Sequence, residues 1–463
     1  MRRLTPTLLA LLVAAAPAAA QTSSEPPPAQ LTPAPGTPGY VPPVTTTPVV
    51  TAPKPATPRR GAASTPVTPP AGNGNTPNGG NTTPVAPQDR PFTWALAARR
   101  RMVTDGVWPS GDTALSSDST RRQLARGLAA ILRTRGNAAA GANAASLPPD
   151  VPAGDPDAAA IAVVAASGLM GPRTTAFHPD ATVTARQADA AVVRALGLTD
   201  ELRGLAGLHT ADGTRFRLPA GFAAAVLVRE MGLRHNYPAD VEAVERSDAQ
   251  PMHAADLMAL VNGARTMDAG RLSALAAYRD IQLPDMGDAQ RSAVQAALWQ
   301  VGHPYVWGGD WPTTASPWGG QAAGGFDCSG LVWWAFKGAP RSQSLNLGGD
   351  LRGRTADDMA WEAPGRRVPL AQLAAGDLVF FGAAGPATKR GGISHAAISL
   401  GGGWIVQSSG SRAGVSVTWL AGYWTAGQAW GRRPVAMGAP PVPVNNTPVT
   451  TTPVTTAPAV APR

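Results

Sequence analysis

The stretch that decides the fold reads Gly325-Phe326-Asp327-Cys328-Ser329-Gly330, and it holds the chain's single cysteine. Apolar residues follow the cysteine at helical spacing, namely Leu331, Val332, Ala335 and Phe336. Because Asp is a favoured N-cap, the pattern predicts a helix that begins at Cys328 directly after Asp327. The positive end of a helix stabilises a thiolate, so this placement favours a reactive nucleophile. The alternative is a buried structural cysteine, which is more often surrounded by aliphatic residues than by glycine.

Two predicted strands supply polar partners for that cysteine. The segment Ile393-Ser394-His395-Ala396-Ala397-Ile398-Ser399-Leu400 is followed by three glycines and then by Trp404-Ile405-Val406-Gln407-Ser408, which is typical of a hairpin. On its two arms, His395 and Gln407 can face the same side. A cysteine that attacks an acyl carbon needs a nearby base, and the base needs a third group that orients its ring. His395 and Gln407 are the candidates, although a lone histidine on a strand is more often a packed or surface residue.

Several separated motifs follow one another along the C-terminal third of the chain. They are Tyr305-Val306-Trp307-Gly308-Gly309, Asp327-Cys328-Ser329-Gly330, Arg354-Thr355-Ala356-Asp357, Gly376-Asp377-Leu378-Val379-Phe380-Phe381 and Ser394-His395. In order and rough spacing they resemble the NlpC/P60 family, the papain-like cysteine peptidases of bacterial cell walls. The resemblance covers about residues 288 to 435, and a catalytic domain is expected at residues 285–435. It implies an α+β papain-like fold, in which a helix carrying the cysteine packs on an antiparallel sheet carrying the histidine.

The resemblance also implies a reaction and a catalytic triad. Members of this family hydrolyse peptide bonds in peptidoglycan stems, commonly between D-glutamate and the following diamino acid. Carried over to this chain, Cys328 is the nucleophile, His395 the base and Gln407 the orienting group. The third position is often His in the family, and otherwise Asn, Gln or Glu. Peptidoglycan is therefore the expected partner, and no cofactor is implied.

Further residues near the cysteine match family positions around the substrate. Tyr305 corresponds to a tyrosine whose hydroxyl lines the site, while Asp327 and Ser329 correspond to positions that contact the substrate. The backbone N–H of Cys328 is expected to help hold the oxyanion. The stretch from Asp310 to Gly325 is longer than usual in the family and carries two tryptophans. It is expected to form either a lid over the site or a surface loop.

Cysteine and histidine counts limit the other chemistries. With one Cys and six His, the chain cannot contain a disulfide-stapled scaffold or a Cys-rich zinc or iron–sulfur site. No metal site is expected. The formal net charge of +9 favours anionic partners. Nucleic acid is set aside among these, because the basic residues do not cluster with aromatic residues in a recognisable binding module.

Both ends of the chain differ in composition from its interior. Arg2 and Arg3 precede an apolar run from Leu8 to Ala20, which predicts a signal peptide at residues 1–20 and a secreted protein of the cell envelope. The run is too short for a membrane-spanning helix, so no transmembrane segment is expected. Residues 21–91 and 436–463 are rich in Pro and Thr and are predicted to be a disordered linker and tail.

The middle of the chain, residues 92–275, is Ala-rich with helical periodicity and is predicted to be all-α. Its helix–loop–helix order resembles surface-layer homology repeats, with second helices starting at Thr120, Thr184 and near Pro251. Such repeats bind anionic secondary cell-wall polysaccharides through basic residues at the starts of those helices. The residues matching that position here are Arg121, Arg122 and Arg186. The alternative is a helical spacer whose arginines are merely solvated.

The leading functional interpretation is a secreted peptidoglycan endopeptidase with a Cys-His-polar triad. One alternative keeps the fold and changes the bond, as in amidases that cleave the muramoyl–alanine linkage. The other is a wall-binding structural protein whose C-terminal domain is catalytically idle.

Overall fold

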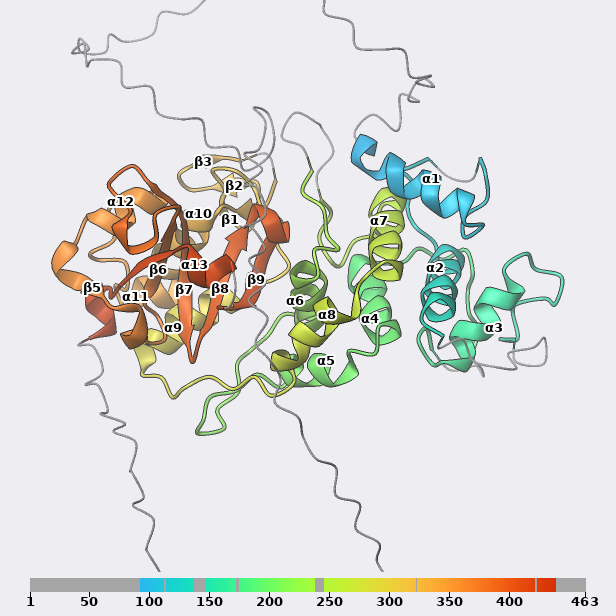
Figure 1. Cartoon of the computed structure of the whole chain (residues 1–463), viewed down its shortest axis with the longest axis horizontal. Coiled ribbons are helices and arrows are strands. Elements are labelled where there is room, and N and C mark those ends of the chain that lie inside the picture. The colour runs from blue at the N-terminus through green and yellow to red at the C-terminus, as the bar shows by residue number, and fades with distance from the viewer. Residues whose placement is uncertain are drawn as a thin grey trace, which may run out of the picture.

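We describe the fold from a computed structural model (Figure 1). The structure describes residues 92–111, 114–136, 147–171, 175–237, 245–321, 323–420 and 423–438. The expected signal peptide at 1–20, the linker at 21–91 and the tail from residue 439 onward lie outside these ranges. Among the helices in the described ranges, none is both long and apolar enough to cross a membrane.

Short helices build the middle region, in agreement with its predicted all-α character. In chain order they are α1 (Leu96–Thr104), α2 (Arg121–Thr134), α3 (Ala158–Ala166), α4 (Ala185–Ala195), α5 (Thr199–Ala206), α6 (Phe222–Glu230), α7 (Ala254–Arg265), α8 (Ala269–Ser273) and the 3-10 turn η3 (Ala274–Tyr278).

Two of these helices begin with the same capping device. The Thr120 hydroxyl accepts a hydrogen bond from the backbone of Gln123, whose side chain accepts one from the Thr120 backbone in return. Thr184 and Gln187 repeat this reciprocal pair at the start of α4. A capping box of this kind satisfies two backbone N–H groups that a helix start leaves without intrahelical partners. The starts of α2 and α4 are therefore specified locally, at the predicted residues.

The extended segments before α2, α4 and α7 close a ring of backbone hydrogen bonds. Ser119 N donates to Met252 O at 2.8 Å, Met252 N to Val183 O at 2.9 Å, and Val183 N to Ser119 O at 2.9 Å. All three residues are buried. This cyclic pattern of hydrogen bonds relates the starts of three helices, α2, α4 and α7, to one another.

The third copy starts two residues later than the sequence predicted. The N-cap of α7 is His253 rather than Pro251. It directly follows Met252 of the hydrogen-bonded ring, just as the N-caps of α2 and α4 directly follow Ser119 and Val183. The His253 side chain makes no capping hydrogen bond, so no capping signature marked the start of α7 in the sequence. The arrangement is threefold, while its relation to surface-layer homology repeats stays a prediction.

A six-stranded antiparallel sheet organises the C-terminal region, with strand order β5-β10-β6-β7-β8-β9. Its strands are β5 (Arg367–Val368), β6 (Leu378–Gly382), β7 (Ile393–Gly401), β8 (Trp404–Ser409), β9 (Gly414–Trp419) and β10 (Gln428–Arg432). The predicted hairpin is β7–β8. Its turn residues Gly401, Gly402 and Gly403 have φ angles of 79°, 59° and 85°, which glycine adopts at no steric cost.

Helices and short turns surround this sheet. They are α9 (Asp288–Leu298), α10 (Cys328–Trp333), the short π-helix η4 (Trp334–Gly338), α11 (Pro340–Ser344), α12 (Ala356–Trp361), α13 (Tyr423–Ala426) and the 3-10 turns η5 (Pro364–Arg366), η6 (Leu370–Gln372), η7 (Gly385–Ala387), η8 (Gly410–Arg412) and η9 (Val435–Met437). Two small ribbons precede α10: β1 (Asp310–Trp311) pairs with β4 (Gly325–Phe326), and β2 (Ala315–Ser316) pairs with β3 (Gly319–Gly320).

Helix α10 packs against β7, as the family resemblance implied. Phe326, Leu331 and Phe336 are fully buried around it, and burying each such side chain stabilises the fold by roughly 1.5–3 kcal/mol. A Cβ at Gly330 would lie 1.9 Å from the carbonyl oxygen of Gly309. Only glycine therefore lets the first turn of α10 approach the loop before β1 this closely.

The middle region packs directly on the far edge strand of the sheet. The end of α6 lies against β9, and the two elements are neighbours in Figure 1. The buried Arg229 guanidinium donates to the carbonyls of Ala413 and Gly302, the latter at 2.7 Å. The Tyr278 hydroxyl donates to Val417 O at 2.9 Å. These hydrogen bonds hold the helical region directly against the C-terminal domain.

Candidate active site

Cys328 is the first residue of α10, and Asp327 is the N-cap, as the sequence predicted. Asp327 Oδ1 accepts the backbone N–H of Gly330 at 2.5 Å and the Ser329 hydroxyl at 3.0 Å. The Ser408 hydroxyl on β8 donates to Phe326 O at 2.6 Å. This bond connects the residues just before Cys328 to the sheet. Local capping and one bond from the sheet therefore place the cysteine.

His395 and Gln407 meet across the β7–β8 hairpin. His395 Nε2 lies 2.6 Å from Gln407 Oε1, and Gln407 is fully buried. Because an amide oxygen can only accept, Nε2 carries the proton, and Nδ1 is left as the unprotonated, basic nitrogen. The rings of Phe381 and Trp424 pack on the imidazole, each with its centroid 5.4 Å away. The predicted same-side placement of the two residues is confirmed, and the ring is held in one tautomer.

The cysteine and the histidine are brought to the same place by the packing of α10 on β7. The backbone N–H of Ala396, next to His395, hydrogen-bonds the Cys328 sulfur and lowers the thiol pKa, against a larger rise from burial. Both side chains are partly exposed. Cys328 and His395 are therefore largely enclosed by protein, and neither residue is completely sealed from solvent.

Burial shifts the pKa values of the thiol and the imidazole in opposite directions. It raises the pKa of Cys328 to about 12, and the Asp327 carboxylate adds to the rise. It lowers the pKa of His395 to about 4, opposed by the bond to Gln407. Desolvation disfavours the charged form of either group. At neutral pH these shifts favour a thiol at Cys328 and a neutral imidazole at His395. The thiolate-stabilising effect predicted from the helix N-terminus is therefore outweighed by burial.

Arg354 holds the cysteine loop together, which the sequence did not single out. Its guanidinium donates to Asp327 Oδ1 at 3.2 Å, to the Ser329 hydroxyl at 2.8 Å and to the carbonyls of Gly308 and Gly309 at 3.0 and 3.2 Å. Five fixed donors let one arginine bridge several acceptors in this way. Its only signal in the sequence was its place in the Arg354–Asp357 motif.

The two residues expected to contact substrate serve mainly as supports. Ser329 is buried and uses its hydroxyl to donate to Asp327 and to accept from Arg354. Asp327 is committed to the helix cap and to the same arginine. Tyr305 is half-buried, and burial together with the charges of Cys328 and Asp327 raises its pKa. Its hydroxyl is thus neutral and lies near the cysteine, whereas the Ser329 hydroxyl is not directed to a substrate.

Asp357 positions the start of the histidine strand. Its Oδ1 accepts the backbone N–H groups of Gly391 at 2.9 Å and Ile393 at 3.1 Å, just before His395. This carboxylate fixes where β7 enters the sheet. Together with Arg354 it gives the Arg354–Asp357 motif a structural explanation, because one end of the motif holds the cysteine loop and the other holds the histidine strand.

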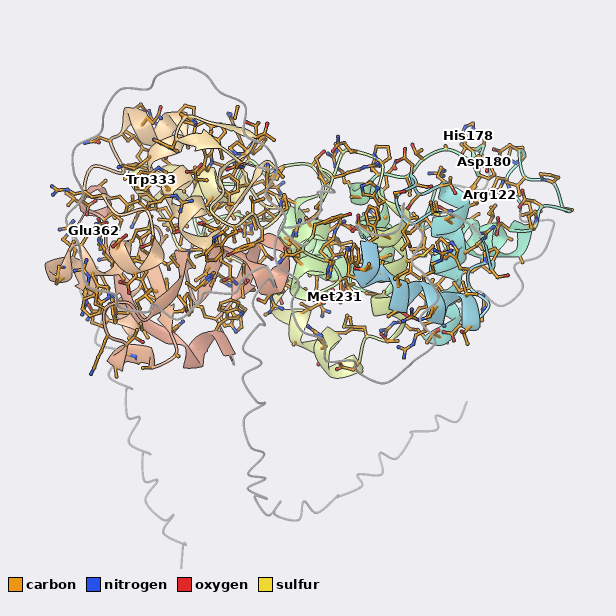
Figure 2. The ribbon with its side chains drawn as sticks, turned by 90° about the horizontal axis from the view of Figure 1, so that it is seen from above. Arg122, His178, Asp180, Met231, Trp333 and Glu362 are labelled. Atoms are coloured by element: carbon orange, nitrogen blue, oxygen red, sulfur yellow. The ribbon has the colours of Figure 1, made fainter. Side chains whose placement is uncertain are left out.

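The long stretch between Asp310 and Gly325 folds onto the cysteine helix. The ring of Trp311 contacts that of Trp334 with centroids 4.5 Å apart, and Trp318 contacts Trp333 at 5.7 Å. Trp333 marks this part of the molecule in Figure 2. Trp318 remains 49% exposed, so the stretch presents an aromatic surface beside α10.

The three arginines predicted to bind polysaccharide have internal partners. Arg121 stacks on Phe177 and donates to its carbonyl. Arg122 pairs with Asp180 at 2.7 Å and with two further aspartates, and it lies beside Asp180 at the outer end of the middle region in Figure 2. Arg186 pairs with Asp248 at 3.2 Å. Polysaccharide binding stays a prediction. Because each of these arginines is engaged within the chain, they do not form a free basic cluster that would support it.

No three His, Cys, Asp or Glu side chains converge on a metal site within the described ranges.

Comparison with known proteins places one family on this part of the chain. The profile of the NlpC/P60 family matches residues 302–433. Murein DD-endopeptidase MepH of Escherichia coli (strain K12) is 31% identical over 157 residues, which are 32% of this chain and 50% of MepH. Probable endopeptidase Rv2190c of Mycobacterium tuberculosis (strain ATCC 25618 / H37Rv) is 39% identical over 132 residues, which are 27% of this chain and 25% of that protein. The chain spans between a quarter and a half of these relatives' length.

Solved structures give similar matches to the same part of the chain. The P60 domain of Mycobacterium avium subspecies paratuberculosis antigen MAP1204 is 32% identical, covers 31% of this chain and 93% of its own, and gives a TM-score of 0.24. The peptidoglycan hydrolase RipB of Mycobacterium tuberculosis is 33% identical, covers 31% of this chain and 64% of its own, and also gives 0.24.

Proposed function

We propose, from the premise that residues 302–433 are an NlpC/P60 domain, that the chain is a secreted cysteine endopeptidase of peptidoglycan stem peptides. One observation carries the proposal. The helix that begins at the partly exposed Cys328 packs on the strand of His395, and the buried amide of Gln407 sets the tautomer of that histidine. Nucleophile, base and orienting group are the three parts that acyl transfer by cysteine requires.

Each group has a defined role in the proposed reaction. His395 Nδ1 accepts the Cys328 proton as the sulfur attacks the scissile carbonyl carbon, since neither group is ionised beforehand. The backbone N–H of Cys328 stabilises the developing oxyanion. The imidazolium then protonates the amine as the C–N bond breaks, which leaves a thioester. Water, deprotonated by the same imidazole, hydrolyses the thioester and restores the thiol.

The bond between D-glutamate and the diamino acid is the proposed site of cleavage. Support for this bond comes from the family resemblance alone. The relatives' names support peptidoglycan as the substrate, while the name of MepH, a murein DD-endopeptidase, specifies a bond between two D centres instead. The basic start and apolar run at residues 1–20 support export to the compartment that holds this substrate.

A defined substrate tests the proposal. The purified chain is incubated with a disaccharide-tetrapeptide, and products are identified by mass spectrometry. The proposal predicts a disaccharide-dipeptide ending in D-glutamate and a dipeptide beginning with the diamino acid. Free disaccharide and an intact tetrapeptide would instead identify an amidase. No product, under conditions in which the protein is folded and sediments with sacculi, would favour the wall-binding alternative.

A further inference from the structure

A chain of buried hydrogen bonds extends from the catalytic amide into the helical region. Gln407 Nε2 donates to the Thr418 hydroxyl at 2.8 Å, and that hydroxyl donates to Glu230 Oε1 at 2.7 Å. Thr418 lies on β9, whereas Glu230 is the last residue of α6. Gln407, Thr418 and Glu230 are all buried. With the bond from His395 to Gln407, the chain runs through four side chains, and it ends outside the NlpC/P60 domain.

The carboxylate at the end of this chain determines the direction of every bond in it. A carboxylate oxygen only accepts, so the Thr418 hydroxyl must donate to Glu230 and present its lone pairs to Gln407. Gln407 must then turn its NH₂ group toward Thr418 and its oxygen toward His395. An amide oxygen at His395 requires the proton on Nε2, which leaves Nδ1 basic. If the carboxylate were absent, the hydroxyl could donate to Gln407 instead, and the amide could turn its NH₂ group to the imidazole.

We propose that Glu230 is a positioning residue for the catalytic histidine, and that the helical region thereby completes the active site. This inference rests on the proposed function, because it concerns the same Cys-His-Gln site. Figure 2 labels Met231, the residue after Glu230, where the middle region borders the C-terminal domain. Activity of the domain is thus tied to the docking of α6.

Several groups hold the Glu230 carboxylate in place. Oε1 also accepts the Ser416 hydroxyl at 2.9 Å, Oε2 pairs with Arg412 at 3.3 Å, and Tyr278 contacts the carboxylate as well. Because both hydroxyls converge on Oε1, that oxygen remains the acceptor whether or not Oε2 carries a proton. A carboxylate buried at the negative end of a helix lowers stability, so neither helix formation nor burial alone explains Glu230.

Thr418→Val in the full chain breaks the link while keeping the side-chain shape. Thr418→Ser restores the hydroxyl, and Glu230→Gln removes the obligate acceptor. Ser416→Ala is the matched control: it deletes a hydrogen bond to the same Glu230 oxygen from the same strand, but lies outside the link to Gln407. We expect Thr418→Val to lower kcat about tenfold with KM unchanged, Glu230→Gln to lower it less, and Thr418→Ser to recover it. Ser416→Ala should lower kcat much less than Thr418→Val does, while losing as much thermal stability, because the Gln407–Thr418–Glu230 link stays intact.

Nitrogen-15 NMR of the His395 ring provides a readout that needs no substrate. The wild type and Ser416→Ala should carry the proton on Nε2, whereas Thr418→Val should contain both tautomers. Unchanged kcat and tautomer in Thr418→Val, or an equal loss of kcat in Ser416→Ala, would overturn the inference. If the wild type cleaves no peptidoglycan, the proposed function fails, and the tautomer comparison still decides the role of Glu230.

Discussion

The ionisation of Cys328 gives the sharpest prediction, because it is the chain's only cysteine and alkylation reports on it alone. Burial raises its thiol pKa to about 12 from an ordinary value of 9.0. At pH 7 the thiolate fraction is then about a thousandfold below that of an unperturbed cysteine. Since only the thiolate reacts, iodoacetamide should alkylate Cys328 about a thousandfold more slowly than a free thiol, with a rate that rises tenfold per pH unit beyond pH 9.

The assay is a series of alkylation rates from pH 4 to 10, measured by intact-protein mass, with the urea-unfolded chain as the control for an unperturbed thiol. His395→Asn should leave the neutral-pH rate nearly unchanged, because a neutral imidazole contributes no charge to stabilise a thiolate. A fast rate that is constant between pH 5 and 8 and collapses in His395→Asn would identify a preformed thiolate–imidazolium pair. That result would refute the conclusion that burial outweighs the helix N-terminus.

Further predictions concern stability and the supports of the site. The His395 pKa is lowered to about 4, so between pH 6.5 and 4 the unfolded chain binds a proton that the folded chain does not. As the pH is lowered through that window, the unfolding free energy measured by urea titration should therefore fall by about 1–3 kcal/mol more in the wild type than in His395→Asn. Gly330→Ala should lower the unfolding free energy by about 1–3 kcal/mol or more, because its Cβ would meet Gly309 O; a normal melting temperature would contradict this. Arg354→Met should reduce kcat and accelerate proteolysis near Cys328, and equal cleavage patterns in the two proteins would argue against its bracing role. Thr120→Ala should cost about 1 kcal/mol and leave kcat unchanged, as a melting curve and a rate measurement on one sample can establish.

Local signals in the sequence predicted the two elements of the C-terminal domain that carry the site. An aspartate cap and helical spacing identified the start of α10, and three glycines between apolar runs identified the β7–β8 hairpin. Hairpin register then placed His395 and Gln407 together. Each of these features depends on residues close together in sequence, where capping, turn chemistry and periodicity act directly.

Features that depend on distant contacts were not predicted. Glu230 and Thr418 are 188 residues apart, and nothing in the Ala-rich helix around Glu230 indicates a partner in the sheet. The partners of Arg354 lie on two separate loops. The start of α7 was misplaced because His253 provides no capping signature. The rise of the Cys328 thiol pKa was not predicted, since burial is a property of the assembled fold.

The central claim is that Cys328 cleaves stem peptides, and one comparison tests it most directly. Purified sacculi are incubated with the full chain or with Cys328→Ala, and the new amino termini are quantified and identified by mass spectrometry. We predict new diamino-acid amino termini with the wild type and none above background with Cys328→Ala. Equal release by both proteins, or no release by a folded wild type, would contradict the assignment of this cysteine as the nucleophile of a peptidoglycan endopeptidase.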